Sequence, residues 1–207
     1  MGGLDRDALR ARLGAGRDAI AAALALLDAA EPAPIAWGAK MSPALRDRCR
    51  IFASDFGTHP DWLPACMAFE TMESFSPSIR PVRNGKRLSS AVGLIQFLES
   101  TARSLGTTTD ALAAMSAEAQ FDYVWRYFRD TVRARGPIRS LEDCYMAIHW
   151  PAAVGKPNAA TMYVRGSDAY AANAGLDLDG DHVITKAEAG SLIRAKLAKG
   201  RLPGNLG

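Results

Sequence analysis

An acidic residue at the end of an apolar helical stripe is the strongest chemical signal in this chain. Glu70 continues a stripe of apolar side chains at helical spacing, namely Leu63, Cys66 and Met67. Further along the chain comes the short segment Gly93-Leu94-Ile95-Gln96. A carboxyl group held in an apolar cleft keeps its proton near neutral pH and can act as a general acid. The pattern therefore indicates acid catalysis beside a turn that binds a sugar, and we expect cleavage of a polysaccharide.

Glu73 is a second candidate acid. It lies three residues after Glu70 and shares its helical face if the helix continues. A second carboxylate next to the first would permit simple hydrolysis, in which it activates a water molecule. The alternative for Glu73 is a solvated charge at the rim of the site.

Two short motifs surround these acids. Phe69-Glu70-Thr71 is followed by Phe75-Ser76-Pro77-Ser78, and Gly93-Leu94-Ile95-Gln96-Phe97 comes after them. This order resembles the lytic transglycosylase family, which has a lysozyme-like fold, and most closely the variant found in phage endolysins and virion-associated lysins. That variant reads Phe-Glu-Thr-x-x-x-Phe-Ser-Pro-Ser, and the second family motif reads Gly-Leu-Met-Gln. The resemblance covers residues 36–170.

The resemblance implies one catalytic acid, Glu70. In this family the glutamate protonates the glycosidic oxygen between N-acetylmuramic acid and N-acetylglucosamine. It then takes a proton from the muramyl 6-hydroxyl, which attacks its own anomeric carbon and gives a 1,6-anhydro sugar. Because this nucleophile is intramolecular, no second carboxylate is required.

Four residues are candidates for binding the sugar. The resemblance implies that Gln96 hydrogen-bonds an N-acetyl group or the glutamate, and Ser90 is a candidate for the rim. Residues 145–153 occupy the place of the third family motif, Ala-Tyr-Asn-Ala-Gly, but Trp150 stands at its tyrosine and Pro151 at its asparagine. Tyr145 or Trp150 could stack on a sugar ring, and the alternative for both is core packing.

An acidic loop near the C-terminus carries a separate signal. Residues 177–188 follow the twelve-position calcium loop of the EF-hand, with ligands expected from Asp177, Asp179, Asp181, the Val183 carbonyl and Glu188. His182 stands where glycine is usual for a left-handed bend, a conformation that histidine adopts more readily than most residues. We expect a structural Ca²⁺ ion there. The alternative is an acidic loop that caps a helix and binds nothing.

Composition limits the partners. The net charge of +3 is compatible with an acidic polymer such as peptidoglycan, and we expect no nucleic-acid partner. The basic helix at the C-terminus could contact an anionic membrane weakly, although a solvated helix face is the more common outcome. The three cysteines form no zinc or redox motif, and we expect Cys66 and Cys144 to be core thiols.

The elements that hold these motifs are mostly helices. We expect a mainly α, lysozyme-like domain with a small β-hairpin around Asn84-Gly85. Helices are expected to begin at Ser42-Pro43, Ser116 and Ser140. The expected division is an N-terminal helix and linker in 1–35, the transglycosylase domain in 36–170, and the calcium loop with its basic helix in 171–207. The N-terminal segment imitates a signal peptide, but its acidic residues favour an amphipathic helix.

The resulting hypothesis is a monomeric peptidoglycan lytic transglycosylase, most consistent with a phage lysin. Such a protein would act from the host cytoplasm on the periplasmic cell wall, or as part of a virion. A hydrolytic muramidase is the first alternative. The second is a calcium-stabilised wall-binding or virion protein without enzymatic activity.

Overall fold

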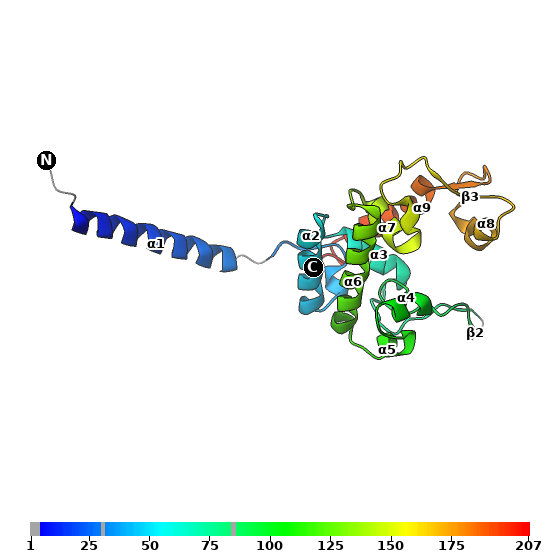
Figure 1. Cartoon of the computed structure of the whole chain (residues 1–207), viewed down its shortest axis with the longest axis horizontal. Helices are drawn as coiled ribbons and strands as arrows, with labels where there is room; N and C mark the ends of the chain where they lie inside the picture. The colour runs from blue at the N-terminus through cyan, green and yellow to red at the C-terminus, as the bar shows by residue number, and fades with distance from the viewer. Residues whose placement is uncertain (1–4, 30–31, 84–85) are drawn as a thin grey trace. The chain divides into compact units, whose positions relative to one another are not determined.

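The computed structural model describes residues 5–29, 32–83 and 86–207, which form two compact units, Met1–Ala33 and Pro34–Gly207 (Figure 1). The first unit is the helix α1, Arg6–Ala29, which confirms the helix expected there. Two of its apolar side chains, Leu13 and Ile20, are exposed.

The second unit is mainly helical with small two-stranded antiparallel sheets, as expected from the sequence. Its α-helices are α2 (Pro43–Phe56), α3 (Trp62–Glu70), α4 (Glu99–Ser104), α5 (Thr109–Ala113), α6 (Ala117–Arg135), α7 (Leu141–His149), α8 (Asp168–Asn173) and α9 (Lys186–Gly200). The short 3₁₀ helices are η1 (Gly38–Lys40), η2 (Pro151–Ala153) and η3 (Ala174–Leu176). The strands are β1 (Val82–Arg83), β2 (Lys86–Arg87), β3 (Thr161–Val164) and β4 (Val183–Thr185).

Local capping sets the helix boundaries. The Ser42 hydroxyl accepts a hydrogen bond from the Leu45 amide in front of the N1 proline of α2, and Gly57 closes that helix with a φ of 62°. Ser116 and Ser140 cap α6 and α7 in the same way. These starts confirm the sequence prediction, because a serine hydroxyl satisfies an amide that has no partner inside the helix.

Helix α3 is the centre of the core and carries Glu70 at its last turn. Its side chains Leu63, Cys66 and Met67 are almost completely buried, and the helix packs against α7 and α9 (Figure 1). The cysteines are all buried free thiols, which confirms the prediction for Cys66 and Cys144. A helix buried on most sides is rigid, so the position of Glu70 is fixed by packing.

The two sheets differ in how predictable they are. Strands β1 and β2 pair antiparallel with Val82 opposite Arg87, which confirms the expected hairpin, while its Asn84-Gly85 turn lies outside the described residues. The pairing of β3 with β4 was not expected. It places Thr161 opposite Thr185, at the end of the acidic loop.

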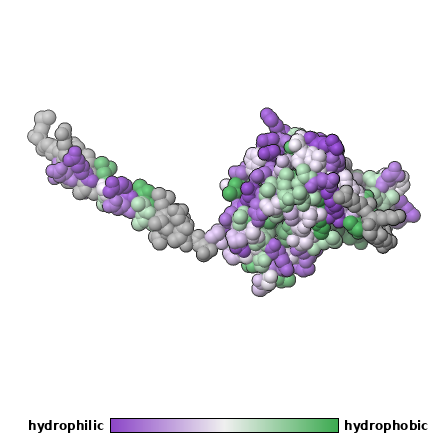
Figure 2. Space-filling view, turned by 90° about the horizontal axis from the view of Figure 1, so that it is seen from below, coloured by the Kyte–Doolittle hydropathy of each residue, from purple (hydrophilic) through white to green (hydrophobic). Residues whose placement is uncertain are grey.

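The C-terminal segment is part of the second unit. We expected a boundary between residues 170 and 171, but α9 packs against both α3 and α7, so residues 171–207 belong to the same compact unit as 34–170. Within the described ranges, no helix is both long enough and apolar enough to cross a membrane. On the face seen in Figure 2, hydrophilic and hydrophobic residues are intermixed.

Candidate active site

A tight turn follows Glu70 and is held by Thr71. The Thr71 hydroxyl donates to the Met67 carbonyl at 2.7 Å and accepts from the Phe75 amide at 3.0 Å. Three residues of the turn, Met72, Glu73 and Phe75, have φ between 51° and 67°. Left-handed backbone at three non-glycine residues costs free energy and persists only where the surroundings impose it, as is common at functional sites.

The buried side chain of Gln120 joins the two sequence motifs. Its Oε1 accepts a hydrogen bond from the Leu94 amide at 2.7 Å, and its Nε2 donates to the carbonyls of Pro77 and Leu112, both at 2.9 Å. Gly93 allows this approach, because a Cβ atom there would lie 2.2 Å from Gln120 Oε1. Gly93 also has a φ of 79°. The turn at 93–96 is therefore fixed against the segment that follows Glu70.

Glu70 lies between two hollows of the surface. The first, about 340 Å³, has mostly apolar walls, formed by Phe69, Met72, Ile79, Pro81, Val82 and Leu88, with Arg80 and Gln96 as its other polar members. The second, about 430 Å³, is lined by Phe69, Tyr145 and His149, and by the α8–η3 residues Ala172, Asn173, Gly175 and Leu176. Glu70 lines both, and it is the one acid among the described residues that do so.

The carboxyl group of Glu70 keeps its proton near neutral pH. Burial raises its pKa to about 8, because removing a carboxylate from water disfavours the charged form. Among the described residues, none donates a hydrogen bond to this carboxyl group or forms an ion pair with it. Glu70 can therefore donate a proton to a group bound between the two hollows.

Gln96 lines the first hollow together with Glu70. It has a φ of 52°, and its Nε2 donates to the Gly93 carbonyl at 3.0 Å and to the Ile79 carbonyl at 3.4 Å. These two bonds orient the amide group and leave its oxygen as an acceptor for a ligand. Ser90, by contrast, accepts a hydrogen bond from the Glu99 amide at the start of α4 and lines neither hollow.

Tyr145 lies in the second hollow, and Trp150 does not. Tyr145 is 2% exposed, and its ring meets that of Phe69 edge to face with the ring centres 5.5 Å apart. Burial and the nearby Glu70 carboxylate raise the pKa of its hydroxyl. Trp150 instead packs on Tyr163 at 5.7 Å, with the Lys156 amine 5.0 Å from the ring centre. Its contacts are those of a packing residue.

Sequence reasoning gave His149 no role, yet it shares the second hollow with Glu70. Its ring stacks on Tyr145 at 5.2 Å, and its Nε2 lies 3.4 Å from the Tyr163 hydroxyl. Burial lowers the pKa of the imidazole, which favours the neutral ring. Its position four residues after Tyr145, on the same face of α7, is the signal that could have found it.

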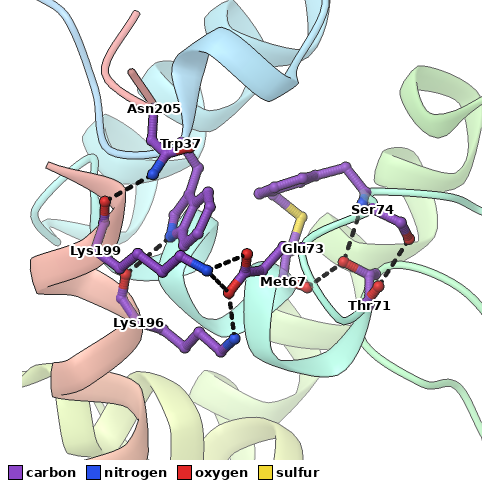
Figure 3. A network of polar contacts seen from close by, with 9 residues as sticks. Trp37, Met67, Thr71, Glu73, Ser74, Lys196, Lys199 and Asn205 are labelled. Carbon is purple, nitrogen blue, oxygen red and sulfur yellow. Dashed lines mark hydrogen bonds and ion pairs between the residues drawn. The ribbon is translucent and has the colours of Figure 1, made fainter. Parts of the chain in front are cut away.

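Glu73 is bound by two lysines of α9. Lys196 Nζ lies 2.5 Å and Lys199 Nζ 2.6 Å from its carboxylate oxygens, as Figure 3 shows. Hydrogen bonds from Lys196 and then Lys199 lower the pKa of this carboxyl group. Glu73 lines neither hollow. Its contacts tie the turn after α3 to the C-terminal helix.

Replacing Glu73 by glutamine should lower the free energy of unfolding by about 1 kcal/mol at pH 7, since the ion pairs are partly exposed. The pKa of Glu73 is lower in the folded protein than in the unfolded chain. The stabilisation by its ion pairs is therefore fully present above the unfolded pKa and is lost as pH falls through the folded pKa. Urea titrations at pH 7 and at pH 3 should show the difference shrinking in acid. Asp130→Asn, at an exposed ion pair with its neighbour Arg129, is the control. If Glu73→Gln changed the free energy of unfolding equally at pH 7 and pH 3, the loss would not come from the charge of Glu73.

The acidic loop brings three carboxylates together. Ligand oxygens of Asp177, Asp179 and Glu188 lie within 4.8 Å of one another, a group that could hold a metal ion. Asp181 lies outside this group, and its Oδ1 accepts from the Val183 amide at 2.7 Å. His182 has a φ of 71°, so it adopts the left-handed bend expected at the glycine position.

The basic residues of the C-terminal segment face acids of their own unit. Arg194 pairs with Glu142, Lys196 and Lys199 pair with Glu73, and Arg201 pairs with Asp61. The basic side chains of this segment therefore have a structural role, because they pair with acids on or next to α3 and α7. The predicted weak contact with an anionic membrane gains no support from them.

No protein-family model matches this chain, and no curated protein matches it either.

Proposed function

We propose that the second unit cleaves the β-1,4 bond between N-acetylmuramic acid and N-acetylglucosamine in peptidoglycan, as a lytic transglycosylase. The observation that carries this proposal is the raised pKa of Glu70, about 8, at the junction of two hollows. A glycan strand could lie through both hollows with the scissile bond at Glu70. The motif resemblance supplies the substrate class.

In the proposed reaction, Glu70 first gives its proton to the glycosidic oxygen. The C1–O bond breaks, and the leaving sugar departs as an alcohol. Glu70, now a carboxylate, takes the proton of the muramyl 6-hydroxyl, whose oxygen bonds to C1 of the same ring. Glu70 is then protonated again, and atoms balance without water. The absence of a second acid among the described residues lining the two hollows supports this route over a two-carboxylate hydrolysis.

Two neighbours would position the sugar. The free amide oxygen of Gln96 can accept a hydrogen bond from an acetamido N–H in the first hollow. In the second hollow, the Tyr145 hydroxyl has no partner among the described residues and can bond a sugar oxygen beside Glu70. Gln96→Ala and Tyr145→Phe would test these roles.

The proposal is tested by incubating the purified protein with purified peptidoglycan. We expect the suspension to clear and soluble muropeptides to appear. A protein that binds the walls without releasing sugar fragments would be the non-enzymatic wall-binding alternative and would overturn the proposal.

We further propose that the group Asp177, Asp179 and Glu188 holds a Ca²⁺ ion. Hard carboxylate oxygens on one short loop are the ligands that Ca²⁺ prefers. These three carboxylates repel one another, and a cation between them would remove that cost. Gly175 and Leu176 line the second hollow immediately before Asp177. The same cation would therefore steady one wall of the site.

Calcium should raise the melting temperature, and chelation should lower it. At a concentration 100 times Kd the gain is about 2.7 kcal/mol. Glu188→Gln should abolish most of this response, since it removes a charged ligand. The exposed acid Asp168, replaced by asparagine, is the matched control and should leave the response intact. Calorimetry that detects no binding at millimolar Ca²⁺ would refute the site.

A further inference from the structure

One wall of the first hollow is a mostly buried cation, Arg80, that does not use all of its hydrogen-bond donors. Arg80 lines this hollow, and its side chain is only 12% exposed. Its Nη2 donates to the Thr109 carbonyl at 3.2 Å and to the Asp110 carboxylate at 2.7 Å. Its Nη1 is buried without a hydrogen-bond partner, and no described residue accepts from its Nε.

This arrangement is costly for the protein alone. A guanidinium group has five N–H donors, and a buried donor without an acceptor loses its hydration without replacement. The two hydrogen bonds of Arg80 use Nη2 alone, and one of them goes to the Asp110 side chain, which is 84% exposed. They leave Nη1 and Nε without an acceptor. Nη1 is enclosed by the protein, whereas Nε is not. A ligand that supplies an anionic oxygen in the hollow would therefore accept a hydrogen bond from Nε, which no described residue uses.

The remaining walls indicate what this anion is attached to. Six apolar residues surround Arg80 and Gln96 in the hollow, and three of them, Met72, Val82 and Leu88, are exposed at more than half of their surface. Exposed apolar side chains around one buried cation fit a ligand with methyl groups close to a carboxylate. The peptide stem of peptidoglycan has this chemistry, because a lactyl group and an alanine, each with a methyl, precede a glutamate.

We propose that the first hollow binds the acidic peptide stem of the muramyl residue, with Arg80 pairing to a stem carboxylate. This inference rests on the proposed function and adds a substrate preference to it. The protein should cleave strands that carry anionic stems better than strands whose stem carboxylates are amidated, or strands from which the stems have been removed. Glu70 performs the chemistry in each case, and Arg80 sets which strand is held.

The test compares kcat and KM on three substrates: strands with anionic stems, the same strands with amidated stems, and strands without stems. For the unmodified protein we expect kcat/KM to fall about 10- to 100-fold from the first to the second, the usual effect of one charge-assisted hydrogen bond, mainly through KM. Arg80→Gln should cleave the first two equally, at the lower rate. Arg80→Lys should restore part of the preference.

Arg103→Gln is the matched control, because Arg103 is an exposed arginine of α4 paired with Glu99, and it should keep the full preference. Equal cleavage of strands with anionic and with amidated stems by the unmodified protein would overturn the inference. This comparison uses the unmodified protein alone, so it does not depend on whether a variant folds. A loss in Arg80→Gln that is equal on all three substrates would also overturn it, because it would show a structural role. If the unmodified protein cleaves none of them, the proposed function has failed instead.

Discussion

Glu70→Gln is expected to reduce cleavage of peptidoglycan by at least about 100-fold, the usual contribution of general acid–base catalysis. Glutamine keeps the shape of the side chain but can neither give nor take the proton. The same change should stabilise the fold by about 1–3 kcal/mol at pH 7. The folded protein holds Glu70 protonated with a pKa of about 8, whereas the unfolded chain releases that proton near its ordinary value of 4.5.

The pH dependence of the unmodified protein follows from the same shift. The folded state binds one proton more than the unfolded state between the two pKa values, so stability should fall as pH rises through that window. Activity should fall as pH passes about 8, where the acid is lost. Glu73→Gln is the matched control and should retain turnover. Normal cleavage by Glu70→Gln, together with loss in Glu73→Gln, would reverse the assignment of the acid.

Gln120→Leu should give the largest loss of stability, about 3 kcal/mol or more. The change leaves one buried amide, that of Leu94, and two carbonyls, those of Pro77 and Leu112, without their partner. Each unpaired buried group costs about 1–3 kcal/mol. Activity should fall as well, because Gln120 fixes the turn that carries Gln96 against the segment after Glu70. Urea denaturation and a cleavage assay on the folded fraction measure both effects.

Ala119→Leu, at the neighbouring exposed position of α6, is the control and should change neither quantity much. Gly93→Ala should also destabilise, through its positive φ and through the contact with Gln120. Because the two residues touch, the effects of Gly93→Ala and Gln120→Leu should be non-additive. Additive losses would show that Gln120 does not act through this turn.

Local signals predicted the helices well. Helix α2 begins at Ser42-Pro43 as expected, because a cap depends on residues within one turn of the helix end. At the start of α7, Ser140 and Asp143 form only one half of a capping box. Ser140 accepts from the Asp143 amide, but the Asp143 carboxylate pairs with Lys186 at 2.5 Å and accepts from the Gly155 amide.

Contacts between distant residues could not be predicted in this way. Lys186 reads as a solvated charge at a helix start, yet it is 1% exposed and binds Asp143 on another helix. Gln120 reads as a surface residue of α6, and its role depends on Gly93 on a different segment. The same holds for Glu73, whose two lysines come from the C-terminal helix. Amphipathic spacing identifies a buried face, but it does not identify the partner that covers it.

The candidate acid itself was visible in the sequence because Glu70 breaks the polarity rule of its helix. The structure adds the two hollows and the shifted pKa, which depend on segments from α3, the β1–β2 hairpin, α7 and η3. His149 and Arg80 also line these hollows, although sequence reasoning assigned neither of them a role in the site. Only the folded arrangement shows that they lie there.

Mass spectrometry of the sugar ends released from peptidoglycan tests the central claim most directly. A single acid with an intramolecular hydroxyl should give fragments that end in 1,6-anhydromuramic acid, lighter than reducing ends by one water. The Glu70→Gln variant, incubated with peptidoglycan in parallel, should release no such fragments. If the released fragments carry only reducing muramic acid, water is the nucleophile, and the transglycosylase proposal is contradicted in favour of a hydrolytic muramidase.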